Sequence, residues 1–404
     1  MFKSFLYRII ERRHFWRYAT FSEIAELYMS RTIRVIAMSI VSGFTSVYLY
    51  EKGYSLVFIM AVFGIYYFIK IPLVFLAGRY IARFGPKHGI LMSNLLYVPS
   101  MVALGLMPVF GIFSIVLWIV FMALSSSIYQ LSYCVDFSKV KSVEHAGKEL
   151  AFMNILEKIA IGISPLIGGL IALYLGIEVV IWISAIMFLV SALPMLRSAE
   201  PTRLRQKIKF EGFPWLTTIR SIISQTGVGF DAVTTGIIWH MFIVIVVFPG
   251  AGWEVYVNLG ALSSVTILTA IAASYAYGKL IDNSKGGNLL KISVIANALV
   301  HMSRPFANVP ISIIGTNVAN EAATMGYSMA FTRGIFDTAD LSGHRILYLC
   351  ICEAVANFGA TLACLILMLL IVLVGNVSGL NIFFFIAAGF VLLIGTARFD
   401  IYRK

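Results

Sequence analysis

The chain has 404 residues, of which 60% are hydrophobic and 12% are charged, and its mean hydropathy is +0.90. Soluble domains contain roughly 45–50% apolar and about 25% charged residues. This composition excludes an ordinary soluble protein, because so much apolar surface needs lipid as its solvent.

The first predicted element is a basic amphipathic segment over residues 1–22. Its apolar side chains share one helical face, and four arginines supply charge around them: Arg8, Arg12, Arg13 and Arg17. Such a segment is typical of a helix lying on an anionic membrane surface, so membrane lipids are an expected partner. A frayed basic tail is the alternative interpretation.

Long continuous apolar runs follow, and they predict an all-α membrane protein. A membrane helix needs about 20 apolar residues, whereas the strands of a membrane barrel alternate apolar with polar residues. Twelve such segments can be delimited. They are Met29–Tyr50, Tyr54–Leu76, Ile90–Val109, Phe113–Cys134, Glu149–Leu175, Val179–Leu196, Ile222–Val247, Tyr256–Tyr277, Leu289–Pro305, Pro310–Phe331, Ile346–Val374 and Leu380–Ala397.

The distribution of basic residues predicts how these segments are oriented. With twelve helices and both termini in the cytoplasm, most of the 31 Lys and Arg fall in cytoplasmic segments, and only Lys52 falls in an external loop. Membrane topology thus accounts for the net charge of +12, and no nucleic-acid partner is needed. The basic stretch 197–220 reads as a cytoplasmic linker between two six-helix bundles, 23–196 and 221–404.

An internal repeat supports this division. The stretch Gly78–Gly85, GRYIARFG, recurs 200 residues later as Gly278–Lys285, GKLIDNSK, and each copy follows the second helix of its half. A second match places Glu157 and Glu353 at equivalent positions, 196 residues apart, in the fifth helix of each half. Two matches at nearly the same offset indicate a duplicated six-helix unit.

The second turn resembles the signature of the major facilitator superfamily, Gly-x-Leu-x-Asp-x-x-Gly followed by basic residues. Gly278, Leu280 and Asp282 match in register, whereas the following Gly286 is displaced by one position. In the fifth helix, Gly162-Ile-Ser-Pro-Leu-Ile-Gly-Gly169 looks like the Gly-Pro-x-x-Gly-Gly element of that family. The resemblance implies two pseudo-symmetric six-helix bundles that give alternating access to a central site.

The resemblance also implies that both turns act in gating. The first copy keeps Gly78, Arg83 and Gly85 but has Ala82 where an aspartate is usual. This basic turn is expected to bind Glu353 or anionic lipid, or else to be a plain solvated turn.

Charged residues within the apolar segments are functional candidates, because a charge in the hydrocarbon core is costly. They are Arg31, Arg34, Lys70, Glu157, Lys158, Asp231, Arg304, Glu321 and Glu353. The equivalent positions of Glu157 and Glu353 favour a shared relay to the cytoplasmic loops, with contact to substrate as the alternative.

Asp231 and Glu321 lie at midplane depth and have no such equivalent. A desolvated carboxylate there can take up a proton on one side and release it on the other, or it can bind a cationic substrate group. Static ion pairs with Arg34, Lys70 or Arg304 are the alternative. His240 and His301 are weaker candidates.

Aromatic residues allow two interpretations. Several can line a cavity or simply fill the bundle: Tyr66, Tyr67, Tyr97, Tyr129, Tyr133, Trp239 and Tyr327. Four tryptophans are assigned to the membrane interfaces: Trp118, Trp182, Trp215 and Trp253.

No enzyme, nucleotide-binding or metal motif is recognised, so we expect no catalytic activity, cofactor or bound metal. A proton or another ion gradient should then drive transport of a small-molecule substrate by a monomer in the cell membrane. An exporter of hydrophobic or cationic compounds is slightly favoured over uptake of a polar or anionic metabolite and over a lipid-linked substrate. A transporter-like sensor or assembly protein without transport is the alternative of another class.

Overall fold

The computed structural model describes residues 21–140, 146–196, 208–249, 254–283 and 285–402. Across these residues the protein is helical. The amphipathic segment predicted for residues 1–22 lies almost wholly outside the described residues.

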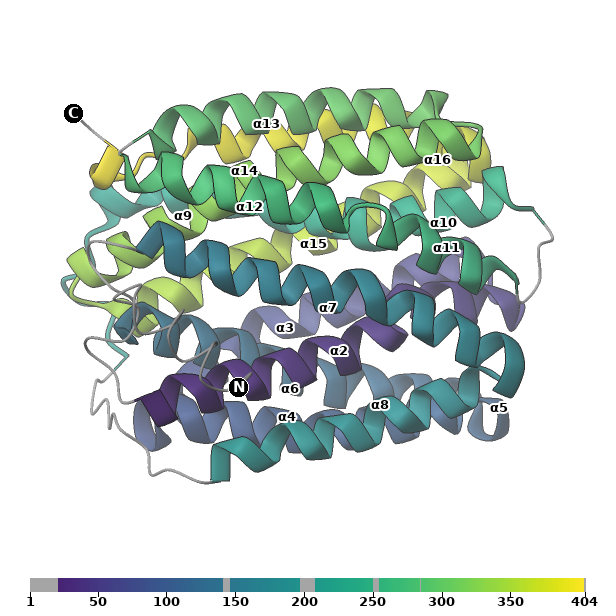
Figure 1. Cartoon of the computed structure of the whole chain (residues 1–404), viewed down its shortest axis with the longest axis horizontal. Coiled ribbons are helices and arrows are strands. Elements are labelled where there is room, and N and C mark those ends of the chain that lie inside the picture. Colours follow the sequence, from purple (N-terminus) through teal and green to yellow (C-terminus); the bar gives the residue numbers. More distant parts are fainter. Residues whose placement is uncertain (1–20, 141–145, 197–207, 250–253, 284, 403–404) are drawn as a thin grey trace, which may run out of the picture.

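The helices of the first half of the chain form one group (Figure 1). α4 packs on α6 and α8, α3 packs on α6, and α2 packs on α7 and α8. The bounds of these helices are α2 Phe21–Glu51, α3 Leu56–Phe84, α4 Pro86–Gly105, α5 Met107–Phe110, α6 Ile112–Val140, α7 Ala146–Leu175 and α8 Ile177–Ala192, which continues as η1 Leu193–Leu196.

The helices of the second half form a second group, in which α9 packs on α15 and α13 packs on α14 and α16. The bounds are α9 Trp215–Val233, η2 Thr234–Ile238, α10 Trp239–Phe242, η3 Ile243–Val247, α11 Glu254–Ser264, α12 Ile267–Asp282, α13 Gly286–Ser303, η4 Arg304–Phe306, α14 Pro310–Leu341, α15 Arg345–Val374, α16 Asn376–Leu392, η5 Leu393–Thr396 and η6 Asp400–Tyr402. α9 begins inside the predicted linker, five residues before its end.

Each of the twelve predicted segments coincides with one of these helices or with consecutive ones. Within the described residues, nine helices are long and apolar enough to cross a bilayer. α8 falls short because it has 16 residues, and α13 and α14 carry more polar side chains. The protein is therefore a multi-pass membrane protein, while the number of crossings and the bundle limits at 196 and 221 stay predictions.

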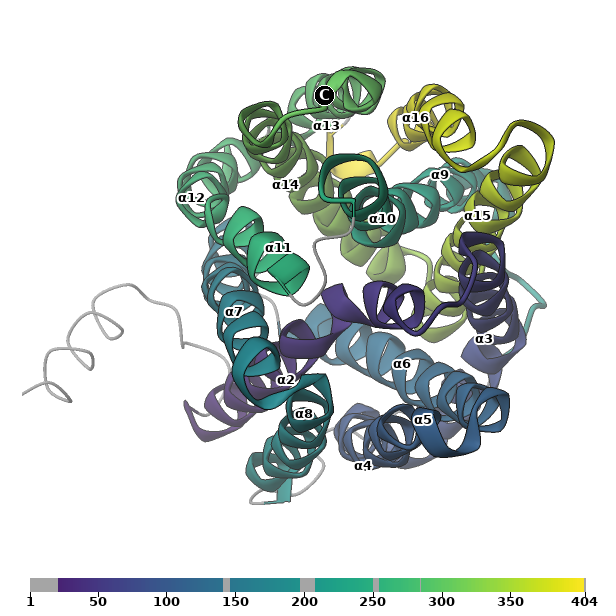
Figure 2. The same ribbon diagram turned by 90° about the vertical axis from the view of Figure 1, so that its right-hand side faces the viewer.

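The two halves meet along two seams (Figure 2). α3 packs on α15 along one seam, and α7 packs on α11 and α12 along the other. Glycines allow the close approach: a Cβ at Gly78 would lie 2.6 Å from Cys350 Sγ, and one at Gly260 would lie 2.7 Å from the carbonyl oxygen of Pro165. Small residues at such crossings let membrane helices pack tightly.

The buried apolar residues form two clusters, and each contains residues from both halves. One cluster includes Tyr48 and Val244, and the other includes Ile81 and Ile281. The same clusters supply walls of the cavities described below: Trp118 and Ile237 belong to the first cluster, and Leu131 and Phe331 belong to the second.

Candidate functional site

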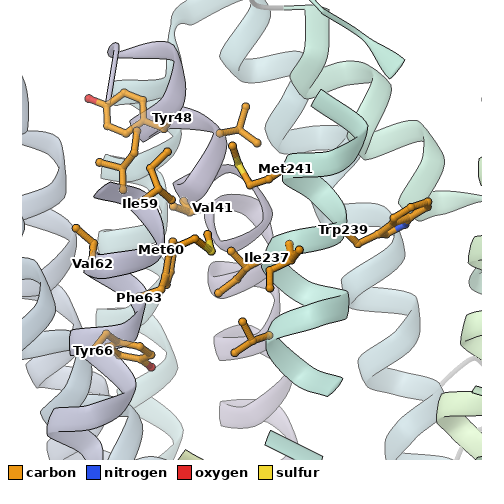
Figure 3. Packing of buried hydrophobic residues seen from close by; sticks show 14 of the residues in the cluster. Val41, Tyr48, Ile59, Met60, Val62, Phe63, Tyr66, Ile237, Trp239 and Met241 are labelled. Carbon is orange, nitrogen blue, oxygen red and sulfur yellow. The ribbon is translucent and has the colours of Figure 1, made fainter. Parts of the chain in front are cut away.

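A cavity of about 340 Å³ lies between the two halves and is lined mainly by aromatic and methionine side chains. We call it the aromatic cavity. Its lining residues include Phe63, Tyr66, Tyr67, Tyr97 and Trp118. Figure 3 shows Met60 and Phe63 pointing towards Ile237 of η2, whereas Trp239 points away. No carboxylate lines this cavity in the described part of the chain.

The local structure of the second half places its residues at this cavity. η2 is a π-helix, with one residue more per hydrogen-bonded turn than an α-helix, and Gly236 and Ile237 of η2 line the cavity. His240, one turn later, also lines it, and its Nδ1 lies 2.9 Å from the carbonyl oxygen of Gly236. π-helical turns are frequent at functional sites.

A second cavity of about 300 Å³ carries more polar groups. We call it the polar cavity. Its lining includes Arg31 and Glu353, together with the amide side chains of Gln130 and Gln225. Tyr133 also lines it.

Three ion pairs lie next to the cavities, and we call their six residues the ion-pair layer. Two of the six, Arg31 and Glu353, also line the polar cavity. Arg31 pairs with Glu157, Lys70 pairs with Glu353 at 3.6 Å, and Lys158 pairs with Glu321 at 2.7 Å. The chain order gives the position of the layer. Lys70 follows Tyr66 of the aromatic cavity by one turn of α3, and Ile161 of the aromatic cavity follows Glu157 by one turn of α7.

Two of these pairs join the halves of the protein. Lys158 of α7 binds Glu321 of α14, and Lys70 of α3 binds Glu353 of α15. The side chains of all four residues are mostly buried, with 9 to 23% exposed. The Arg31–Glu157 pair stays within the first half. Glu157 and Glu353 occupy matching positions in the sequence repeat, but Glu157 pairs within the first half and Glu353 pairs across the two halves.

Asp231 lies in a separate buried cluster of the second half. It accepts a hydrogen bond from the hydroxyl of Tyr327, and its Oδ1 lies 2.6 Å from Nε2 of His301. Nη1 of Arg304 lies 2.9 Å from Nδ1 of His301. Because arginine only donates, Nδ1 accepts and Nε2 carries the proton that is donated to Asp231.

Arg304 is fully buried in this cluster and also donates to Asn320 Oδ1 at 2.9 Å. The neutral imidazole of His301 thus links an aspartate to an arginine, and the cluster has no net charge. Asp231 itself does not line either cavity. Of the three basic residues considered as static partners of Asp231, Arg304 is the one in this cluster. Its contact with Asp231 is indirect, because His301 lies between them.

Arg34 is 1% exposed and has no carboxylate partner among the described residues. Its Nη1 donates to Asn94, its guanidinium carbon lies 3.7 Å from the centre of the Tyr129 ring, and its Nε has no hydrogen-bond partner. Met38, one turn later on α2, lines the aromatic cavity, as does Tyr97, whose ring centre is 5.4 Å from Arg34. The guanidinium therefore lies next to this cavity.

The glycines of the two gating turns have structural roles. Gly85 ends α3 with a φ of 94°, which favours glycine. Gly78 allows α3 to approach α15, and Gly278 is buried in α12, which ends at Asp282. Arg83 is exposed and lies over the ring of Phe84, 5.2 Å from its centre. Glu353 binds Lys70 at 3.6 Å, and the contact between the first turn and Glu353 or lipid stays a prediction.

The four tryptophans assigned to the membrane interfaces differ in their exposure. Trp182 and Trp215 are exposed, as expected at membrane interfaces. The assignment of Trp118 is wrong, because this side chain is 3% exposed and lines the aromatic cavity. Trp253 lies outside the described residues.

A sequence model described as Major Facilitator Superfamily matches residues 27–345. No curated protein matches the chain in sequence. The fold is similar to an outward-conformation structure of the transporter FucP, with a TM-score of 0.67, 12% identity, and coverage of 93% of this chain and 97% of the other. A variant of the E. coli fucose:proton symporter FucP gives a TM-score of 0.62 at 12% identity, with 94% and 100% covered.

Proposed function

Because the chain belongs to the Major Facilitator Superfamily, we propose that it is a proton-coupled secondary transporter that carries a small organic solute by alternating access. In this proposal it crosses the cell membrane twelve times as a monomer, with both termini in the cytoplasm. The observation that carries the mechanism is the pair of lysine–carboxylate contacts, Lys158–Glu321 and Lys70–Glu353, that join the two halves.

The proposed coupling follows from the chemistry of these contacts. Each pair attracts one half to the other while its glutamate is ionised. Protonation of Glu321 removes the attraction and leaves Lys158 without its partner, which favours separation of α7 from α14. A proton bound from one side of the membrane can then be released on the other side after the halves have moved.

Asp231 has a different role in this proposal. Its carboxylate is occupied by His301 and Tyr327 inside one half, so its protonation would break no contact between the halves. We assign Glu321 to proton coupling, with Glu353 as the second carboxylate, and Asp231 to holding α9, α13 and α14 together.

The aromatic cavity supports a solute with a large apolar surface, as expected for the favoured class of hydrophobic compounds. A positive charge on that solute is not supported by the lining, which includes no carboxylate among the described residues. Arg34 favours the second candidate, an anionic metabolite, because this buried cation has no carboxylate partner there.

Solute-induced proton movement tests the proposed function. Purified protein is reconstituted in vesicles that contain a pH-sensitive dye, and aromatic acids, aromatic amines and sugars are added in turn. We expect at least one solute to change the internal pH in protein-containing vesicles but not in empty ones. If none does, and none accumulates under an imposed gradient of protons or sodium, the non-transporting sensor becomes the better reading.

A further inference from the structure

The walls of the aromatic cavity and the sign of the charges around it both restrict the ligand that it can bind. The walls provide stacking surfaces. Tyr66 and Trp118 are stacked with their ring centres 6.3 Å apart, and Phe63 meets Trp118 edge to face at 5.9 Å. Met38, Met101 and Met122 fill the space between the rings. Aromatic and thioether side chains of this kind favour a flat, polarisable ligand.

The hydrogen-bonding groups of the walls are few. The polar groups of the lining are Ser39, Thr45, His240, the tyrosine hydroxyls and the indole N–H of Trp118. The hydroxyl of Tyr66 already donates to Ser126 at 2.9 Å, whereas Nε1 of Trp118 has no hydrogen-bond partner among the described residues. No amide or carboxylate side chain lines the cavity in the described part of the protein. A sugar, which presents many hydroxyls, would lose more hydrogen bonds to water here than these walls could replace.

Cations lie close to three of the aromatic rings that line the cavity. Nζ of Lys70 is 5.4 Å from the centre of the Tyr66 ring and 5.6 Å from that of Tyr67. The guanidinium of Arg34 is 5.4 Å from the centre of the Tyr97 ring. These rings therefore already face a cation, and a second cation stacked on them would be repelled.

The carboxylates nearby do not cancel these charges completely. Lys70 is balanced by Glu353, and Arg304 by Asp231 through His301. Arg34 has no such partner in the described residues, so the buried charges beside the cavity carry a net positive charge. In surroundings of low dielectric constant this favours an anion in the cavity.

We propose that the aromatic cavity binds a planar aromatic compound with a single negative charge, with its rings among Tyr66, Tyr97 and Trp118 and its anionic group towards Arg34. This assignment names the class of ligand that the cavity binds. Only the further statement that the ligand is the transported solute rests on the proposed function. Arg34 does not line the cavity; it acts through the potential that it creates there.

Three ligands of one shape and different charge test the assignment. They are 2-naphthoate, 2-naphthamide and 2-naphthylmethylammonium, and L-fucose serves as a sugar. Equilibrium binding of each radiolabelled compound is measured on purified full-length protein in detergent, without any gradient. Because no transport is measured, the result is independent of whether proton coupling is correct.

We expect naphthoate to bind at least about tenfold more tightly than naphthamide, which corresponds to about 1.4 kcal/mol, and the ammonium compound to bind most weakly. Arg34→Met should reduce the preference for naphthoate over naphthamide to near unity, and Arg34→Lys should retain part of it. Gln130→Ala, in the polar cavity, is the matched control and should leave all affinities unchanged.

A second variant covers the case in which changes at Arg34 prevent folding. Met122→Trp adds bulk within the aromatic cavity and should abolish binding of naphthoate and naphthamide alike. Equal or tighter binding of the neutral or cationic compound would overturn the assignment of charge. Binding of fucose without binding of any naphthyl compound, or binding unaffected by Met122→Trp, would overturn the assignment of this cavity.

Discussion

Nζ of Lys158 and Oε1 of Glu321 lie 2.7 Å apart, although the lysine belongs to α7 in the first half of the chain and the glutamate to α14 in the second. The contact is mostly buried, so its charges are only partly screened by water. It joins the halves about one helical turn from Ile161 of the aromatic cavity. Its formation and rupture can therefore follow the relative movement of the two halves.

A charge exchange at this contact should restore what each single change removes. Lys158→Glu places two carboxylates opposite each other, and Glu321→Lys places two lysines there. We expect each single variant to lose at least about tenfold in transport rate, which corresponds to about 1.4 kcal/mol, and the double variant to recover most of it.

The measurement is initial uptake in vesicles for the four proteins of the cycle. A coupling energy near zero would mean that the two residues do not act as a pair. The same exchange at Lys52 and Glu178, which pair within the first half and are partly exposed, is the control and should not alter uptake.

The buried cluster around Asp231 predicts a loss of stability. Asp231→Asn would leave the buried guanidinium of Arg304 without a compensating charge, and breaking a buried pair in this way costs about 3–5 kcal/mol. We expect the midpoint of thermal unfolding of the purified protein to fall by several degrees. Glu51→Gln changes an exposed carboxylate and is the control. An unchanged midpoint for Asp231→Asn would contradict a structural role for this carboxylate.

The crossing of α9 and α15 predicts a steric effect. A Cβ at Gly229 would lie 1.7 Å from the carbonyl oxygen of Ala356, so Gly229→Ala cannot be accommodated without moving α15. Overpacking of this kind costs roughly 1–3 kcal/mol, and the folded yield and thermal midpoint should both fall. Gly389→Ala is the control, because nothing lies within 4 Å of its Cβ position. Equal effects of the two changes would show that the crossing tolerates a wider spacing.

The candidate residues were predictable from the sequence because charges are rare in apolar segments. Arg34, Lys70 and Glu321 stand out there. Their partners were not predictable, since ion pairing depends on which helices become neighbours in space. Glu157 and Arg31 are 126 residues apart in the chain, and Asp231 and His301 are 70 apart.

Two local features could not be predicted from the sequence. The π-helical turns η2 and η3 occur in a stretch without proline, where ordinary α-helix is expected. The sequence places Trp118 at an interface because an apolar stretch alone does not distinguish a side chain that faces lipid from one that faces a cavity. η2 and Trp118 both contribute to the aromatic cavity, where helix packing decides which face is buried.

The most direct test of the coupling mechanism compares accumulation and exchange for Glu321→Gln. Vesicles containing wild-type or variant protein are given the same pH gradient and radiolabelled 2-naphthoate, or whichever solute moves protons in the wild-type protein. Counterflow of labelled against unlabelled solute is measured without a gradient. We predict that the variant loses uphill accumulation while counterflow continues, because glutamine cannot exchange a proton but still allows the halves to move. Uphill accumulation by Glu321→Gln equal to that of the wild type would contradict the mechanism.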